Sequence, residues 1–117
     1  MTRSKRKTEL EIKKEQAFKL YKSIKKVYCP ALKTHVYFTR WGWNHIVQKK
    51  GRSGKEQIKR LDKLSYVKQI IITASVISEV RQLNEYTTYR INETINSRNI
   101  GIIIFKKLST YYFVSII

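Results

Sequence analysis

The spacing of apolar residues changes once along this chain of 117 residues. Up to about residue 71 they recur at helical intervals, whereas from about residue 76 β-branched and aromatic residues come in short runs separated by polar breaks. Four such runs with short connections predict an antiparallel sheet over 76–117. We therefore expect an α+β fold, with N-terminal helices packed on one face of a four-stranded antiparallel sheet. The length fits a single domain, residues 1–117.

The N-terminal quarter predicts one basic amphipathic helix. Thr8 and Glu11 form a capping box, and the apolar residues that follow recur every three or four positions over 9–27. The residue before Pro30 is disfavoured in a helix, so the helix ends there. A short β-like run follows at 35–39.

Two more helices are predicted in the middle of the chain. Thr39 can N-cap a short helix over about 40–49. Ser53 and Glu56 form a second capping box, which opens a helix over about 54–71.

The charge of the chain indicates a polyanionic partner. Lysine and arginine number 25 against 8 acidic residues, which gives a net charge of +17. Such an excess opposes compaction by self-repulsion, and it suits nucleic acid first, an anionic membrane surface second and an acidic protein third. Most of the excess lies in residues 1–60, so this half is expected to meet the polyanion.

Several other chemistries fit poorly. Cys29 is the only cysteine, so an intramolecular disulfide and a cysteine-rich zinc site are excluded. The two histidines lie among scattered acids, so neither a metal site nor a cofactor is expected. No apolar window approaches the length of a membrane span, and we expect a soluble protein acting in the cytoplasm. A toxin domain from the end of a longer secreted protein would look the same.

The predicted short helix carries a tryptophan and a histidine on one side. At about 100° per residue, Trp43 falls on the apolar arc, whereas Trp41 and His45 fall together on the opposite side. An indole can stack a base, and histidine ordinarily titrates near neutral pH, where it can move a proton at a 2′-hydroxyl. The alternative is an ordinary surface histidine beside a tryptophan that folds over the edge of the core.

A basic, glycine-containing loop follows at residues 49–55. Arg52, with the N–H groups at the start of the next helix, would bind a phosphate. The other cations expected to follow a nucleic-acid backbone here are Arg40, Lys49, Lys50 and Lys55. A solvated basic turn is the more frequent explanation of such a loop.

The last predicted strand alternates between two faces. If Tyr112, Val114 and Ile116 face the helices, then Ser115 and Tyr111 lie on the open face of the sheet. The Ser115 hydroxyl could there bind a phosphate, and Lys106 and Arg90 could reach the same face. The alternative is a small residue in a tight position and cations at solvated strand ends.

Four stretches of the chain together resemble a known family: YCPALKTHVYFTRWGWNHI, KRLDKLSYVKQII, IGIIIFKK and YYFVSII. Over about residues 28–117 they look like the phage and polymorphic-toxin branch of the barnase, EndoU, colicin and RelE superfamily of small ribonucleases. The resemblance implies an antiparallel four-stranded sheet backed by helices. Its open face would cleave RNA without a metal and leave a 2′,3′-cyclic phosphate.

The resemblance also assigns roles to residues. His45 falls at the family's helix histidine, Arg52 at the basic residue after it, and Ser115 at the hydroxyl of the final strand. In the resulting hypothesis His45 is the general acid or base, and Arg52 with Lys106 stabilises charge on the phosphate. Ser115 and His35 position that phosphate, and Trp41 stacks a base.

Two other functions remain open. A non-catalytic RNA- or DNA-binding module would use the same cations on the backbone and the tyrosines on the bases. A protein that docks an acidic partner is the third, and for a toxin that partner would be its immunity protein or antitoxin.

Overall fold

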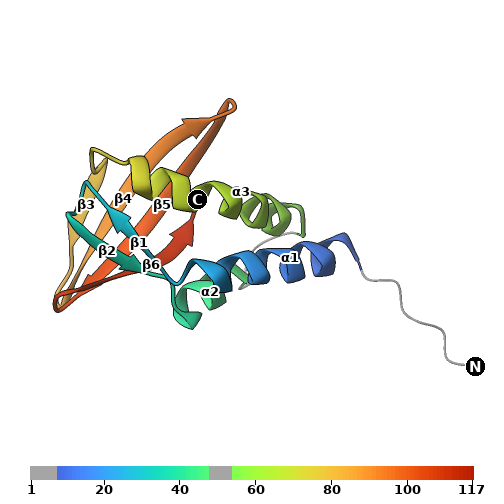
Figure 1. Ribbon diagram of the computed structural model, residues 1–117, viewed down its shortest axis with the longest axis horizontal. Helices are drawn as coiled ribbons and strands as arrows, with labels where there is room; N and C mark the ends of the chain where they lie inside the picture. The colour runs from blue at the N-terminus through green and yellow to red at the C-terminus, as the bar shows by residue number, and fades with distance from the viewer. Residues whose placement is uncertain (1–7, 48–53) are drawn as a thin grey trace, which may run out of the picture.

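A computed structural model describes residues 8–47 and 54–117 (Figure 1). The helices are α1 (Glu9–Ile24), α2 (Arg40–Val47) and α3 (Gly54–Thr73). The strands are β1 (Lys26–Cys29), β2 (Thr34–Tyr37), β3 (Glu79–Gln82), β4 (Tyr86–Ile95), β5 (Arg98–Lys107) and β6 (Thr110–Ile116). The α+β class expected from the sequence is confirmed.

The first helix begins as predicted but ends earlier. The Thr8 hydroxyl accepts a hydrogen bond from the Glu11 amide at 3.2 Å, which confirms the N-cap. The helix ends at Ile24 because Lys25 takes a positive φ of 61° and turns the chain. The next four residues form β1, whose Val27 and Cys29 are buried. The prediction of helix up to residue 27 is therefore wrong at its C-terminal end.

The two later helices agree well with their predicted positions. Helix α2 begins directly after Thr39, and α3 runs two residues beyond the predicted end at 71. The predicted cap at Ser53 and the predicted end of α2 at 48–49 lie outside the described residues. The buried Gln57 donates from Nε2 to the carbonyl oxygen of Ile46 at 2.6 Å, so α3 satisfies the C-terminal end of α2.

The sheet has six strands rather than the four expected, in the order β1-β2-β6-β5-β4-β3. The four strands predicted after residue 76 are present and antiparallel. The β1–β2 hairpin extends the sheet, and β2 pairs with β6 in parallel, so the sheet is mixed. The prediction missed this because β1 was assigned to the helix and the run at 35–39 was left without a partner.

Helices α1 and α3 lie on one side of the sheet and pack against each other (Figure 1). Lys13 of α1 binds Asp62 of α3 at 2.9 Å. Between these helices and the sheet lies one apolar core, to which α3 and the central strands contribute most of the aliphatic side chains. None of the helices in the described ranges is long and apolar enough to cross a membrane.

Helix α2 packs against β6, beyond Tyr111 and Tyr112, the two residues at which β6 pairs with β2. The approach is close, because a Cβ on Gly42 would collide with the carbonyl oxygen of Phe113 and the hydroxyl of Tyr21. Trp43 points to the core, as predicted, and its ring lies 5.6 Å from that of Tyr21. Trp41 and His45 lie on the other side of α2, toward the face of the sheet that points away from α1 and α3.

Strand β6 contains a bulge that changes which residues share a face. Phe113 lies opposite Ile104, but Ser115 lies opposite Ile103, so Val114 is an extra residue in β6. Phe113 is fully buried and stacks on Phe38 at 4.7 Å. Phe113 therefore faces the helices, contrary to the alternation expected from the sequence.

Candidate nucleic-acid interface

The face of the sheet that points away from α1 and α3, here called the open face, carries a row of aromatic and basic residues. Directly opposed residues on neighbouring strands share a face. The strand register places one residue from each strand in this cross-strand row: Lys26, Tyr37, Tyr112, Phe105, Thr88 and Arg81. Three adjacent aromatic rings thus lie between two terminal cations. At about 4.8 Å per strand, the row spans about 24 Å.

Trp41 and His45 lie together at the open face. Their ring centroids are 5.1 Å apart in an edge-on arrangement, and the Trp41 ring is 5.0 Å from Phe105 in the cross-strand row. The Trp41 side chain is 42% exposed and His45 is half-buried. The expected pairing of the indole with the imidazole, clear of the apolar core, is therefore present.

A hollow of about 360 Å³ lies in front of Trp41. The side chains around it are Thr39, Trp41, Phe105, Lys107 and Tyr112. Tyr86 packs on the far side of Phe105, with ring centroids 4.4 Å apart. The hollow thus offers aromatic walls for a base and one ammonium group for a phosphate, which are the two groups that a nucleotide presents.

His35 also lies on the open face, but on β2. It is paired with Tyr28, and their rings are 5.3 Å apart. Both side chains are exposed, whereas their strand neighbours Val27 and Val36 are buried. His35 therefore belongs to the same face as His45, although its ring contact is with a different aromatic residue.

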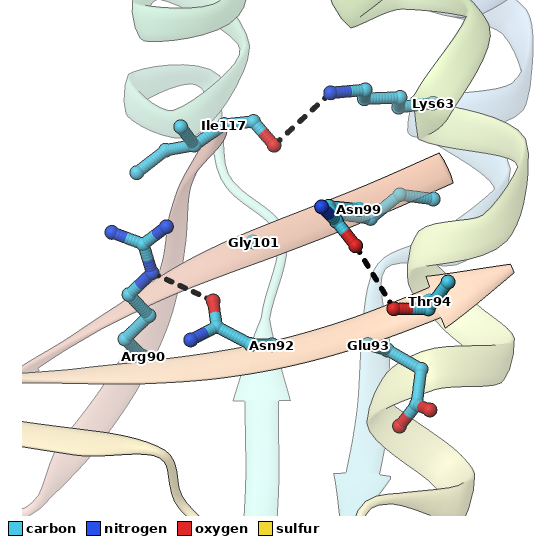
Figure 2. A pocket seen from close by; sticks show the side chains of 9 residues that line it. Lys63, Arg90, Asn92, Glu93, Thr94, Asn99, Gly101 and Ile117 are labelled. Carbon is cyan, nitrogen blue, oxygen red and sulfur yellow. Dashed lines mark hydrogen bonds between the residues drawn. The ribbon is translucent and has the colours of Figure 1, made fainter. Parts of the chain in front are cut away.

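Arg90 borders a second hollow, a notch of about 630 Å³ shown in Figure 2. Its Nε donates to Asn92 Oδ1 at 2.7 Å, and a Cβ on Gly101 would lie 3.1 Å from its Nη2, so the guanidinium rests on this glycine. Lys63 enters the notch from α3 and lies 3.3 Å from the carbonyl oxygen of Ile117. Gly101 and Phe105 are four residues apart on β5, so the notch lies roughly 13 Å from the hollow beside Trp41.

Ser115 lies on the open face as predicted, but its hydroxyl already has a protein partner. Nη1 of Arg60 is 3.4 Å from Ser115 Oγ and 2.5 Å from the carbonyl oxygen of Ile116. Arg60 of α3 thus reaches the side of β6 that bears Ser115, near the C-terminal end of this strand. A phosphate bound at Ser115 would contact this guanidinium. The sequence predicts Arg60 in the helix but does not predict its position beside Ser115.

Lys106 and Tyr111 lie on the opposite face, contrary to the prediction. Tyr111 is paired with Val36, which is fully buried on the helix side, and Lys106 is paired with Tyr111. The Lys106 ammonium lies 5.4 Å from the centre of the Tyr111 ring. Burial and the adjacent Tyr111 raise the pKa of Tyr89 in this same cluster. The open face instead holds the next residues along each strand, Lys107 and Tyr112.

The remaining predicted cations are less closely connected to the hollow. Arg40 is exposed at the first position of α2, next to Trp41, and Lys55 is exposed in the first turn of α3. Lys49, Lys50 and Arg52 lie outside the described residues. Within residues 8–47 and 54–117, no three histidine, cysteine, aspartate or glutamate side chains are grouped so that they could hold a metal ion.

Neither a family model nor a curated protein nor a solved structure matches this chain. The resemblance to small ribonucleases therefore stays a prediction, and the candidate interface stands on its own geometry.

Proposed function

We propose that this protein is a toxin-like endoribonuclease that binds single-stranded RNA on the open face and cleaves it without a metal ion. The observation that carries this proposal is the position of Trp41, whose ring contacts Phe105 of the sheet and the imidazole of His45. A base stacked beside Trp41 would bring its ribose and phosphate close to His45. The finer proposal is membership of the barnase, EndoU, colicin and RelE superfamily.

The open face suits an unpaired strand. Bases of any sequence can stack on exposed aromatic rings, while cations neutralise the backbone. The cross-strand row supplies the rings, with Lys26 at one end and Arg81, in an exposed ion pair with Glu79, at the other. Lys107 lies beside the Trp41 hollow. The notch at Arg90 presents guanidinium, ammonium and amide donors together with the carboxylate of Glu93, and the donors suit a further phosphate.

The proposed reaction needs only groups of the chain and the RNA. The 2′-oxygen attacks the adjacent phosphorus, and the bond from phosphorus to the 5′-oxygen of the next nucleotide breaks. The products are a 2′,3′-cyclic phosphate and a 5′-hydroxyl. His45 takes the proton from the 2′-hydroxyl or gives one to the leaving oxygen, and Lys107 stabilises charge on the phosphate. Arg52 remains a candidate for stabilising that charge, and His35 and Ser115 remain candidates for positioning the phosphate.

A non-catalytic RNA- or DNA-binding module is the second candidate. The row of rings across neighbouring strands favours it, because such a row binds bases whether or not a proton is transferred. In either case an acidic protein that covers the open face would compete with RNA, and for a toxin this would be the immunity protein or antitoxin.

The proposal is tested with one RNA oligonucleotide and a matched copy in which every 2′-hydroxyl is replaced by hydrogen, both in EDTA. We expect the RNA to yield cyclic-phosphate ends and the deoxy copy to bind but stay intact. An RNA that is bound and never cut would reject the ribonuclease and leave the binding module.

A further inference from the structure

Strand β3 forms one edge of the sheet (Figure 1). All four of its side chains are exposed, and Val80 retains 57% of its surface. In the part of the chain that the structure describes, no strand pairs with its outer side. An exposed edge of this kind presents unpaired N–H and C=O groups to another chain.

The backbone N–H and C=O groups of Val80 point away from β4, toward the free side of β3. The Leu83 amide donates to the carbonyl oxygen of Tyr86, and the Arg81 carbonyl oxygen accepts from the Thr88 hydroxyl, so residues 81 and 83 face β4. Backbone groups alternate in direction along a strand. The N–H and C=O of Val80 and Gln82 therefore point away from the sheet and are available to a new strand.

The charges of β3 complement a second copy of the same strand. Glu79 and Arg81 lie on the open face, opposite Arg90 and Thr88 of β4, and are 3.2 Å apart. In an antiparallel pair centred on Val80, Glu79 of each copy lies opposite Arg81 of the other. Shifting the centre by one residue either way would oppose two Glu79 or two Arg81 side chains. The outward backbone groups permit all three registers, and the charges select the one centred on Val80.

We propose that two copies of this chain associate by antiparallel pairing of their β3 strands, with Val80 on the two-fold axis. The axis is perpendicular to the sheet, so both open faces lie on the same side and form one continuous surface. Leu83, which directly follows β3 and is 39% exposed, loses water on pairing. This inference is independent of the proposed function. A four-residue edge is far smaller than a standard interface of about 1,600 Å², so the dimer is weak and reversible.

Sedimentation velocity over a range of protein concentrations tests the register. We expect the parent protein to show a monomer–dimer equilibrium. Glu79→Arg and Arg81→Glu should each weaken self-association by about tenfold or more, because each variant opposes like charges. An equimolar mixture of the two variants should associate as well as the parent, since each Arg then faces a Glu of the other copy.

Val80→Pro removes the central N–H donor and should abolish the dimer. Because these side chains are exposed, circular dichroism should show that all three variants stay folded. A parent protein that remains monomeric at millimolar concentration would overturn the inference. So would a dimer in which the mixed variants fail to recover association, because another surface would then be responsible.

Discussion

The indole of Trp41 lies 5.0 Å from the ring of Phe105, so a side chain from α2 contacts the central part of the open face. The same indole lies 5.1 Å from the imidazole of His45. These two contacts place a titratable group beside a surface of aromatic rings and cations. The proposed function depends on this relationship, and the predictions below test its parts separately.

Replacing Trp41 tests base stacking. Trp41→Ala should weaken binding of single-stranded RNA by about 1–3 kcal/mol, the contribution of one stacked base. Trp41→Phe keeps an aromatic face and should retain most of the affinity. Fluorescence anisotropy with a labelled oligonucleotide measures both. Equal affinities for the parent and the alanine variant would show that the hollow beside Trp41 is not a base site.

Lys106 and Lys107 form a matched pair, because they are adjacent in β5 and lie on opposite faces. Lys107→Ala should lower the slope of log affinity against log salt by about 0.7, the value for one phosphate contact on a single strand. Lys106→Ala should leave this slope unchanged. A larger effect at Lys106 would place RNA on the helix side of the sheet.

Gly42 tests the close packing of α2 on β6. Gly42→Ala should destabilise the protein by about 1–3 kcal/mol, because the new Cβ meets the backbone of Phe113 and the Tyr21 hydroxyl. Gly54→Ala is the control, since no atom of the described residues 8–47 and 54–117 lies within 4 Å of its Cβ position. Urea denaturation should find the control at least as stable as the parent. Equal stability of both variants would contradict the close approach.

Burial raises the pKa of Tyr21, whose hydroxyl donates to the Thr39 carbonyl oxygen. An unfolded tyrosine titrates near pH 10, so the folded protein keeps this proton to higher pH. The stabilisation from Tyr21 is therefore complete below about pH 10 and falls as the pH rises further. Tyr21→Phe should cost about 0.5–1.5 kcal/mol at pH 7.

Between about pH 9 and pH 11 the free energy of unfolding should fall less in Tyr21→Phe than in the parent protein. All other ionisable groups are the same in both proteins, so the difference isolates Tyr21. Parallel stability curves for the two proteins over this pH range would contradict a buried, protonated phenol.

The helices and the C-terminal strands were predictable because their residues show the local patterns of their final structures. Thr8 caps α1 as predicted, and the apolar stripe of α3 predicted nearly the full length of that helix. Strand β1 was missed because Val27 also fits the helical repeat of α1. The helix ends there because Lys25 adopts a positive φ of 61°, and lysine at this position gives no sequence signal for such a turn.

The faces of β6 were harder to predict because of its bulge. Strict alternation gave the correct face for Ser115 and Ile116, but the wrong one for Tyr111 and Tyr112. An extra residue at Val114 changes the alternation, and no glycine marks it. Trp41 and His45 were placed correctly because the helical period alone separates them from the core. The position of Arg60 beside Ser115 was not predicted, because this contact joins parts of the chain that are distant in the sequence.

The most direct test of the central claim compares the parent protein with His45→Ala on the same RNA in EDTA, measuring binding and the chemistry of the product ends. We expect the parent to release 2′,3′-cyclic-phosphate ends, and the variant to bind with similar affinity while cleaving at least about 100-fold more slowly. Undiminished cleavage by the variant, or no cleavage by the parent, would contradict a catalytic role for His45.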